Sequence, residues 1–330
     1  MSRSAPAETR TPRGTLPAMT TTTPPRHLLG VKGLPREELR AILARARAHA
    51  DAIREGTVER TLEGVFVSTL FLEDSTRTRL SFETAIERLG AGLIRFDART
   101  SSLSKGESLL DTAQTLVAGG AGCLVLRHAS SGAAGHLARQ LEATGYGVPV
   151  INAGDGMHEH PTQALLDVFV LEERLGTLEG KLIAIVGDIL RSRVARSLTH
   201  ALHTLGARVH HVGPRAFVQD GTGAPVFHDP LAGTHGADAV VFLRIQHERS
   251  GGRAAYLPPS SYRRLYSNAV EGLIPDGAII MHPGPVNRGV ELDAATLSDP
   301  RCAVLDQVAA GIPVRMAVLE RALSKTWGTP

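Results

Sequence analysis

Apolar residues follow two spacings along the chain, and their alternation predicts a series of helices and buried strands. One apolar face in LPREELRAILARARAHADAIREG has the three- and four-residue spacing of a helix, with Leu39, Ile42, Leu43 and Ala46. The run that follows, GVFVSTLFLE, is almost continuously apolar, as is typical of a strand buried on both faces. We expect strands at 64–73, 92–97, 122–127, 148–153, 181–188, 208–214, 237–244 and 277–285. We expect further helices at 79–90, 108–120, 132–145, 162–176, 192–206 and 306–324.

This order of strands and helices predicts an α/β fold with two domains, each a mostly parallel sheet flanked by helices. We place the first domain at 26–158, with the final helix region 306–330 returning to it, and the second at 159–305. Residues 1–25 are rich in Thr, Pro, Ser and Ala without apolar periodicity, which predicts a disordered leader. The expected place for a site is the cleft between the two domains.

Composition excludes several classes of protein. No apolar run approaches the roughly 18 residues that span a bilayer, so no membrane partner is expected. The first 25 residues hold +2 of the net charge of +3, and the nearly neutral remainder argues against nucleic-acid binding. Cys123 and Cys302 lack metal-ligand spacing and have apolar neighbours, which predicts buried thiols in a reducing compartment, the cytoplasm.

The stretch EDSTRTRLSFE, at 73–83, is the first candidate for chemistry. It lies where a strand ends and a helix begins, and there free backbone N–H groups and the helix dipole attract an anion. Its hydroxyl and guanidinium donors suit a phosphate and come from Ser75, Thr76, Arg77 and Thr78. The alternative is an ordinary capped helix whose arginines pair with Glu73 and Glu83. Arg79, one turn further, is better explained as a buttress of the loop.

Further polar residues stand where strands end. Arg127 ends the strand 122–127, at the sheet edge where ligands bind in α/β proteins. Earlier in the chain, a Ser/Gly-rich loop before the helix 108–120 carries Lys105, which taken alone would be interpreted as a surface lysine. His160 precedes Pro161 at the first turn of a helix, where a neutral imidazole can donate a hydrogen bond to a polarised carbonyl; the alternative is a helix cap. Gln163 lies on the same helix face. The histidines around Glu159 lack the HExxH spacing, so we expect no metal.

The second half places arginines beyond its strand ends. Arg193 follows the strand 181–188, and Arg244 and Gln246 follow the strand 237–244. The sequence MHPGPVNRGVE adds a stiff turn after a third strand. Several arginines at one sheet edge indicate a substrate with more than one carboxylate, although each arginine alone would be explained by a surface salt bridge. The segment 181–188 ends in Gly187 without a G-x-G-x-x-G pattern, which argues against NAD.

Together these motifs resemble the transcarbamoylase family, and within it the catalytic chains of aspartate transcarbamoylases. The pattern F-x-E-x-S-T-R-T-R-x-S-F-E matches Phe71 to Glu83 in full. The other matches, in chain order, are S-x-x-x-K-G-E, R-H, H-P-T-Q, G-D…R, R-x-Q-x-E-R and H-P-x-P-x-x-R-x-x-E. The resemblance covers roughly residues 26 to 325.

The resemblance implies that carbamoyl phosphate and L-aspartate give N-carbamoyl-L-aspartate and phosphate in pyrimidine synthesis, without cofactor or metal. It implies that carbamoyl phosphate is bound by Ser75, Thr76, Arg77, Thr78, Ser101 (or Ser102), Lys105, Arg127, His160 and Gln163. It implies that aspartate is bound by Lys105, Arg193, Arg244, Gln246, Gly284 and Pro285. The residues taken as catalytic are Arg77, Thr78, Lys105, Arg127 and His160. Domain 26–158 then binds carbamoyl phosphate, and domain 159–305 binds aspartate.

The resemblance also implies a homotrimer with shared sites, because the loop with Ser101 and Lys105 is supplied by a neighbouring subunit. Regulatory or dihydroorotase-like partner chains are compatible with it. Two alternatives stay open: another amino-acid acceptor such as ornithine, and a non-catalytic scaffold that binds carbamoyl phosphate. The ornithine branch carries H-C-L-P and S-M-G, which are absent here. The chain departs from many relatives at Gly284, where a bulkier residue is common, and at the short, glycine-rich segment 216–236.

Overall fold

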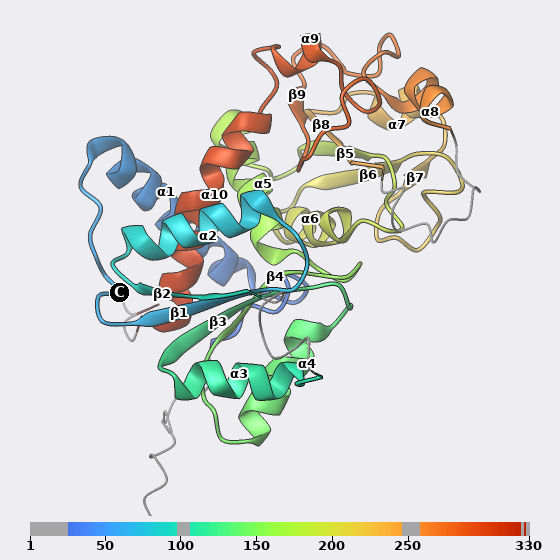
Figure 1. The fold of residues 1–330 in the computed structure, drawn as a ribbon. Helices are drawn as coiled ribbons and strands as arrows, with labels where there is room; N and C mark the ends of the chain where they lie inside the picture. Colours follow the sequence, from blue (N-terminus) through green and yellow to red (C-terminus); the bar gives the residue numbers. More distant parts are fainter. Residues whose placement is uncertain (1–25, 98–105, 246–257, 325–326, 328–330) are drawn as a thin grey trace, which may run out of the picture.

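The computed structural model describes residues 26–97, 106–245, 258–324 and 327, which form two parallel sheets flanked by helices (Figure 1). The first sheet has the order β2-β1-β3-β4, and the second has the order β7-β6-β5-β8-β9. Every neighbouring pair of these strands runs parallel. The predicted α/β class is therefore confirmed. The strands are β1 (Phe66–Phe71), β2 (Gly92–Phe96), β3 (Ala121–His128), β4 (Val150–Asp155), β5 (Leu182–Val186), β6 (Arg208–Val212), β7 (Val226–Phe227), β8 (Ala239–Phe242) and β9 (Ile279–Met281).

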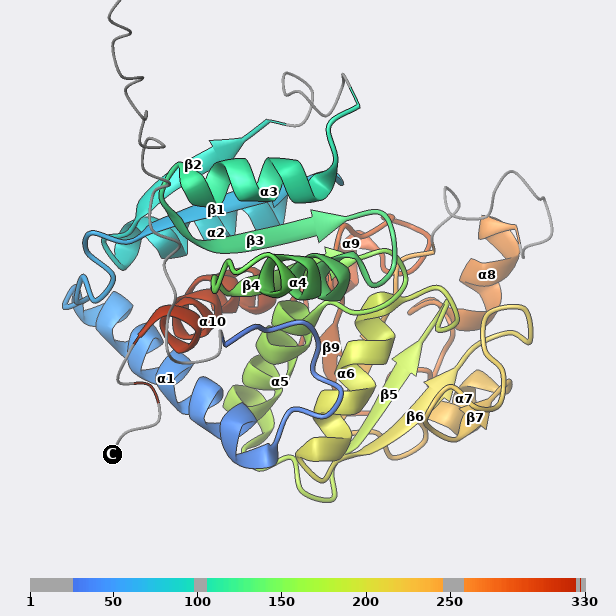
Figure 2. The same cartoon turned by 90° about the horizontal axis from the view of Figure 1, so that it is seen from below.

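Helices cover both faces of the first sheet. Figures 1 and 2 show α1, α2 and α10 on one face and α3 and α4 on the other. The apolar stripe expected for the first helix is buried on α1. The helices are α1 (Arg36–Glu55), α2 (Thr76–Arg88), α3 (Leu109–Ala118), α4 (Ala133–Ala143), α5 (Pro161–Leu175), α6 (Arg193–Thr204), α7 (Pro230–Thr234), α8 (Pro259–Tyr266), α9 (Ala294–Leu297) and α10 (Val304–Leu323).

The last helix, α10, returns from the second sheet and packs against α1, α2 and α5 (Figure 1). A buried carboxylate fixes this return. Glu320 accepts hydrogen bonds from Arg45 and Thr61 and contacts Nε2 of His49 at 2.9 Å. These bonds lower the pKa of Glu320 to about 2, although burial alone would raise it. Residues far apart in the sequence are thereby joined beside the first sheet.

Three short helices, α7, α8 and α9, were not expected from the sequence. Each has eight residues or fewer, so too few turns are present to show a helical period. The glycine-rich segment 216–236 contains β7 and α7, with Asp229 capping the first turn of α7. A side-chain cap and a proline at the first turn therefore form a helix here where apolar periodicity is missing.

The two cysteines differ in burial. Cys123 on β3 is fully buried as expected, but Cys302 is only half-buried, so the expectation of burial was wrong for Cys302. Cys302 lies just before α10, where the chain pairs with the edge strand β9 through Ile280. Within the described ranges, no helix is long and apolar enough to cross a membrane.

Candidate active site

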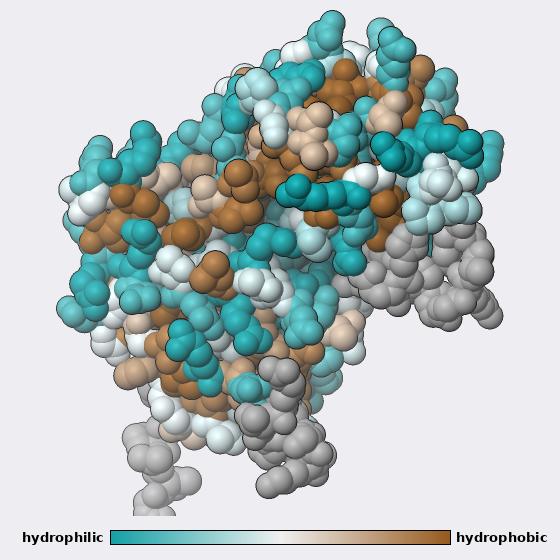
Figure 3. All heavy atoms as spheres, turned by 45° about the horizontal axis from the view of Figure 1, so that its top comes forward, coloured by the Kyte–Doolittle hydropathy of each residue, from teal (hydrophilic) through white to brown (hydrophobic). Residues whose placement is uncertain are grey.

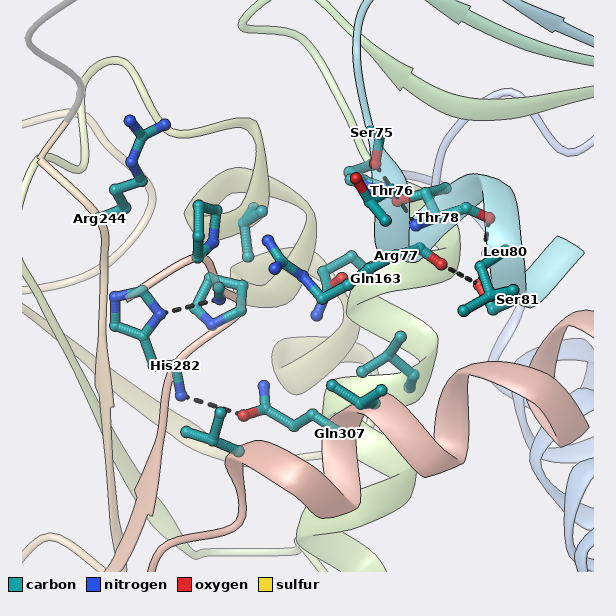
Figure 4. A pocket seen from close by; sticks show the side chains of 18 of the residues that line it. Ser75, Thr76, Arg77, Thr78, Leu80, Ser81, Gln163, Arg244, His282 and Gln307 are labelled. Carbon is teal, nitrogen blue, oxygen red and sulfur yellow. Dashed lines mark hydrogen bonds between the residues drawn. The ribbon is translucent and has the colours of Figure 1, made fainter. Parts of the chain in front are cut away.

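A cleft of about 1060 Å³ lies between the parts of the chain that carry the two sheets, bordered by α2, α5, α6 and α10. Figure 4 shows Arg77 and Arg244 on opposite sides of it. Figure 3 shows hydrophilic residues interspersed with small hydrophobic patches on one face of the molecule. The predicted site residues that line the cleft are Ser75, Thr76, Arg77, Thr78, Arg127, His160, Gln163, Arg193, Arg244, Gly284 and Pro285. The structure thus brings together residues from both halves of the sequence.

The amino end of α2 forms one wall of the cleft. Ser75 is the N-cap in extended backbone conformation, and its hydroxyl accepts the Thr78 N–H at 3.4 Å. The hydroxyl of Ser81 donates to the Arg77 carbonyl oxygen at 2.7 Å and closes the first turn (Figure 4). Burial and the charge of Arg244 lower the pKa of Arg77. A wall of N–H groups, hydroxyls and crowded cations favours an anion in this cleft.

Glu73 connects two of the predicted arginines. Both its oxygens accept from Arg193, at 2.8 and 2.9 Å, and one accepts from Arg127 at 3.1 Å. Arg193 also donates to the Gly156 carbonyl oxygen, and Arg127 donates to that of Ala153. These two arginines come from β3 and α6, so a capped helix whose own arginines pair with Glu73 and Glu83 does not account for the bonds of Glu73. Arg79 instead lies over the Phe71 ring, with 5.3 Å from its guanidinium carbon to the centroid.

Glycine 154 lets these two guanidinium groups approach the backbone. Gly154 has a φ of +114°, and a Cβ built there would lie 3.0 Å from Nη1 of Arg127 and 3.1 Å from Cζ of Arg193. A side chain at this position would therefore be strained and would press on both arginines.

His160 is the N-cap residue of α5, but its side chain makes no capping bond. It is 4% exposed, and its Nδ1 has no hydrogen-bond partner among the described residues. Burial lowers the pKa of His160 well below its usual range, and the charges of Arg127, Arg193 and Arg315 add to the effect. The ring is therefore neutral, so that one nitrogen donates and the other accepts. This is the state expected for a donor to a carbonyl.

Sequence reasoning missed a buried polar group behind the cleft. Asp167 on α5 accepts Nε2 of Gln163 at 2.9 Å and Nε2 of Gln307 at 2.7 Å. Arg315 on α10 is also buried, and burial lowers its pKa to about 9. A signal was present: Asp167, Gln307 and Arg315 interrupt apolar faces of helices, where a charged or amide side chain needs a partner.

The turn after β9 forms the wall that belongs to the second sheet. Gly284 donates its N–H to Nδ1 of His282 at 2.8 Å. It has a φ of +66°, and a Cβ there would lie 3.0 Å from Cζ of Arg77. The absence of a side chain at Gly284 therefore lets Arg77 approach this turn. Glu291, the last residue of the motif H-P-x-P-x-x-R-x-x-E, was given no role from the sequence. It accepts the N–H groups of Ile245 and Asn287 and joins the residue after Arg244 to the same turn.

Four of the residues predicted for the site lie outside the described residues. They are Ser101, its alternative Ser102, Lys105 and Gln246. The placement of the others in one cleft leaves their individual roles as predictions.

Comparison with known proteins gives the class that this fold and cleft define. Residues 26–173 match the family model for the carbamoyl-phosphate-binding domain of aspartate/ornithine carbamoyltransferases. Residues 179–322 match the model for the aspartate/ornithine-binding domain. The chain belongs to the aspartate/ornithine carbamoyltransferase family.

The individual relatives include several aspartate carbamoyltransferases. The chain is 47% identical over 301 residues to an aspartate carbamoyltransferase catalytic subunit of Myxococcus xanthus, covering 89% of this chain and 98% of the relative. It is 48% identical over 307 residues to one from Saccharopolyspora erythraea, with coverages of 91% and 98%. A structure of aspartate transcarbamoylase from Trypanosoma cruzi with carbamoyl aspartate and phosphate is similar at a TM-score of 0.79 and 30% identity, with coverages of 91% and 97%. Ornithine carbamoyltransferase from Pyrococcus furiosus has a TM-score of 0.78 at 28% identity, with coverages of 92% and 98%.

Proposed function

We propose that this chain transfers the carbamoyl group of carbamoyl phosphate to the amine of L-aspartate, giving N-carbamoyl-L-aspartate and phosphate for pyrimidine biosynthesis. The main support is that cationic side chains from both halves of the chain line one cleft around a neutral, buried His160. The names of the curated relatives support aspartate as acceptor, and the Trypanosoma cruzi structure carries carbamoyl aspartate and phosphate.

The first turn of α2 suits the phosphate of carbamoyl phosphate. Backbone N–H groups, the hydroxyls of Ser75, Thr76 and Thr78, and the Arg77 fork supply donors at a positive helix end. Burial and, after it, the charge of Arg244 lower the pKa of Arg77, and an anion placed here would offset both effects. We assign these residues to the phosphate for these reasons.

The transferred carbamoyl group would lie between Thr78, Arg127 and His160. The aspartate nitrogen attacks the carbonyl carbon, a C–N bond forms, and the bond to the bridging phosphate oxygen breaks. The carbonyl oxygen gains negative charge on the way, and donors fixed in advance stabilise that charge. The departing phosphate takes the amine proton, so the scheme needs no side-chain general base, and orientation supplies much of the rate.

Arg193 and Arg244 would hold the two aspartate carboxylates, with the turn at Gly284 and Pro285 behind them. Arg193 is already oriented by Glu73 and by the Gly156 carbonyl oxygen. A guanidinium held in this way loses less rotamer freedom when a carboxylate binds. We further assign Gln246 to the same substrate from the motif R-x-Q.

We propose a cytoplasmic homotrimer in which Ser101 and Lys105 of one subunit complete the site of its neighbour. Mixing Lys105→Ala chains with His160→Ala chains tests this, because some mixed sites would contain both native residues. The mixture should regain activity that neither parent shows. Inactive mixtures of well-folded, assembled parents would refute the shared site.

The central experiment compares L-aspartate with L-ornithine as acceptors for the purified chain. Turnover with aspartate alone is the expected result, because two arginines face the acceptor. Turnover with ornithine would assign the chain to the other branch of the family. Binding of carbamoyl phosphate without turnover on either acceptor would favour the scaffold alternative.

A further inference from the structure

One buried carboxylate connects α5 and α10, which both border the cleft. Asp167 lies on α5 and is fully buried. Its Oδ1 accepts the side-chain amides of Gln163, one turn earlier on α5, and of Gln307 on α10. Its Oδ2 has no hydrogen-bond partner among the described residues. Gln163 and Gln307 both line the cleft, whereas Asp167 lies behind them.

A backbone N–H group sets the direction of this chain of hydrogen bonds. The N–H of His282 can only donate, and it donates to Oε1 of Gln307 at 3.0 Å (Figure 4). The NH₂ of Gln307 must therefore face Asp167, and Asp167 must accept. Because Oδ1 of Asp167 is an acceptor, the group of Gln163 that faces it must be the NH₂ donor. The carbonyl oxygen of Gln163 is then the end of that amide left for the cleft.

This direction holds in both protonation states of Asp167. Burial raises its pKa to about 7, while the bonds from Gln307 and Gln163 act in the opposite sense. A proton would occupy the partnerless Oδ2, and Oδ1 would remain an acceptor for both amides. Gln163 therefore presents an acceptor to the cleft whether or not the carboxyl is charged.

An amide oxygen held in this way distinguishes ligands that differ only in one small group. It accepts a hydrogen bond from an NH₂ group, whereas a methyl group in the same place leaves the oxygen desolvated and unpaired. A site built around such a bond rejects the analogue that lacks it much more strongly than an apolar pocket does.

We propose that Asp167 is a positioning residue that, with Gln307, holds the Gln163 carbonyl oxygen toward the cleft and makes the site selective for an NH₂-bearing acyl phosphate over its methyl analogue. The inference deepens the proposed function and rests on it for the substrate class. A purely structural Asp167, bridging α5 and α10, would instead change the stability of the protein and affect both kinds of ligand equally.

The test measures binding of phosphonoacetamide and acetonylphosphonate, which differ by NH₂ against CH₃, to the full-length protein by titration calorimetry. We expect the wild type to prefer the amide at least tenfold. Asp167→Ala should reduce that preference to about threefold or less through weaker amide binding, with the ketone unchanged. Asp167→Val fills the space that alanine leaves empty and should reduce the preference in the same way, which separates the loss of the acceptor from the loss of volume. Asp167→Asn keeps one acceptor oxygen and should retain most of the preference.

A matched control is Asp238→Ala, which removes an aspartate that accepts from the Leu182 N–H and from Lys181, away from the cleft. It should lose stability and keep the preference. In a Gln163→Ala background, Asp167→Ala should change the preference no further. A wild type without preference overturns the inference. So does an Asp167→Ala or Asp167→Val variant that keeps the preference or weakens both ligands equally. Carbamoylation of aspartate is measured separately, so failure of the proposed function is seen independently of these binding results.

Discussion

Replacing Gly154 by alanine should reduce activity more than its effect on stability explains. The added Cβ would meet Arg127 at 3.0 Å and Arg193 at 3.1 Å, where carbon contacts normally optimise at about 3.5–4.0 Å. Both guanidinium groups would have to move by roughly 0.5 Å, although Glu73 and backbone carbonyls hold them.

The size of the effect follows from that displacement. Holding reacting groups within about 0.5 Å is what a preorganised site requires, and a shift of about 1 Å can cost on the order of 100-fold. We therefore expect Gly154→Ala to lower kcat/KM for aspartate by about 10- to 100-fold. The unfavourable φ of +114° should also cost about 1–3 kcal/mol of the free energy of unfolding.

Gly120→Ala separates the two effects. Gly120 has a similar φ of +104°, but a Cβ there meets nothing within 4 Å. The two variants should lose comparable stability in urea unfolding, and Gly120→Ala should keep wild-type kcat/KM per folded site. Equal activity of the two variants would show that close packing of the arginines over Gly154 contributes nothing to the reaction.

Three further predictions concern titratable side chains. Glu320→Gln should cost up to about 3 kcal/mol of unfolding free energy at pH 7, because the pKa falls from 4.5 to about 2 on folding. A depressed pKa stabilises above pH 4.5 and loses its effect as pH falls towards 2, so urea unfolding should show the gap to wild type narrowing below pH 4.5; a constant gap would contradict this. His160→Ala should lower kcat by about 10²–10³-fold without removing an acid limb near pH 6.5, because the native ring is already neutral there; a limb that vanishes in the variant would refute a neutral His160. Glu73→Gln should tighten inhibition by inorganic phosphate a few-fold, because the loss of the carboxylate leaves the charges of Arg127 and Arg193 uncompensated, and should lower kcat/KM for aspartate about tenfold, because both arginines lose orientation; weaker binding of both ligands would contradict this balance.

Much of the fold could be predicted because its elements carry strong local signals. The strand β1 is an apolar run, and α1 has a regular buried stripe from Leu39 to His49, about three turns long. The short helices α7 to α9 lack such a repeat and depend on caps and tertiary contacts. Burial of Cys302 was misjudged because apolar neighbours in the sequence do not say which side of the chain faces solvent.

The site was predictable where polar residues follow strand ends, and less so where they act through other side chains. Ser75 and Arg77 stand at a strand–helix junction that the sequence itself marks. Glu73 was visible in the motif, but its bonds to Arg127 and Arg193 join residues 54 and 120 positions away. Asp167 interrupts an apolar helix face, which indicates that it needs a partner, but that partner, Gln307, lies 140 positions away and no local pattern identifies it.

The two chain connections between the sheets lie side by side. One follows α5 at 176–181 and the other precedes α10 at 298–303, and Arg174 bonds both to Asp306 and to the Pro300 carbonyl oxygen. The part that carries the second sheet is thus attached through two neighbouring connections, and the pair between Glu73 and Arg193 adds a contact across the cleft. Arg244 follows β8 of the second sheet, and Arg77 lies on α2 beside the first sheet. A rotation about these two connections would change the distance between the two cations and would have to open the pair between Glu73 and Arg193.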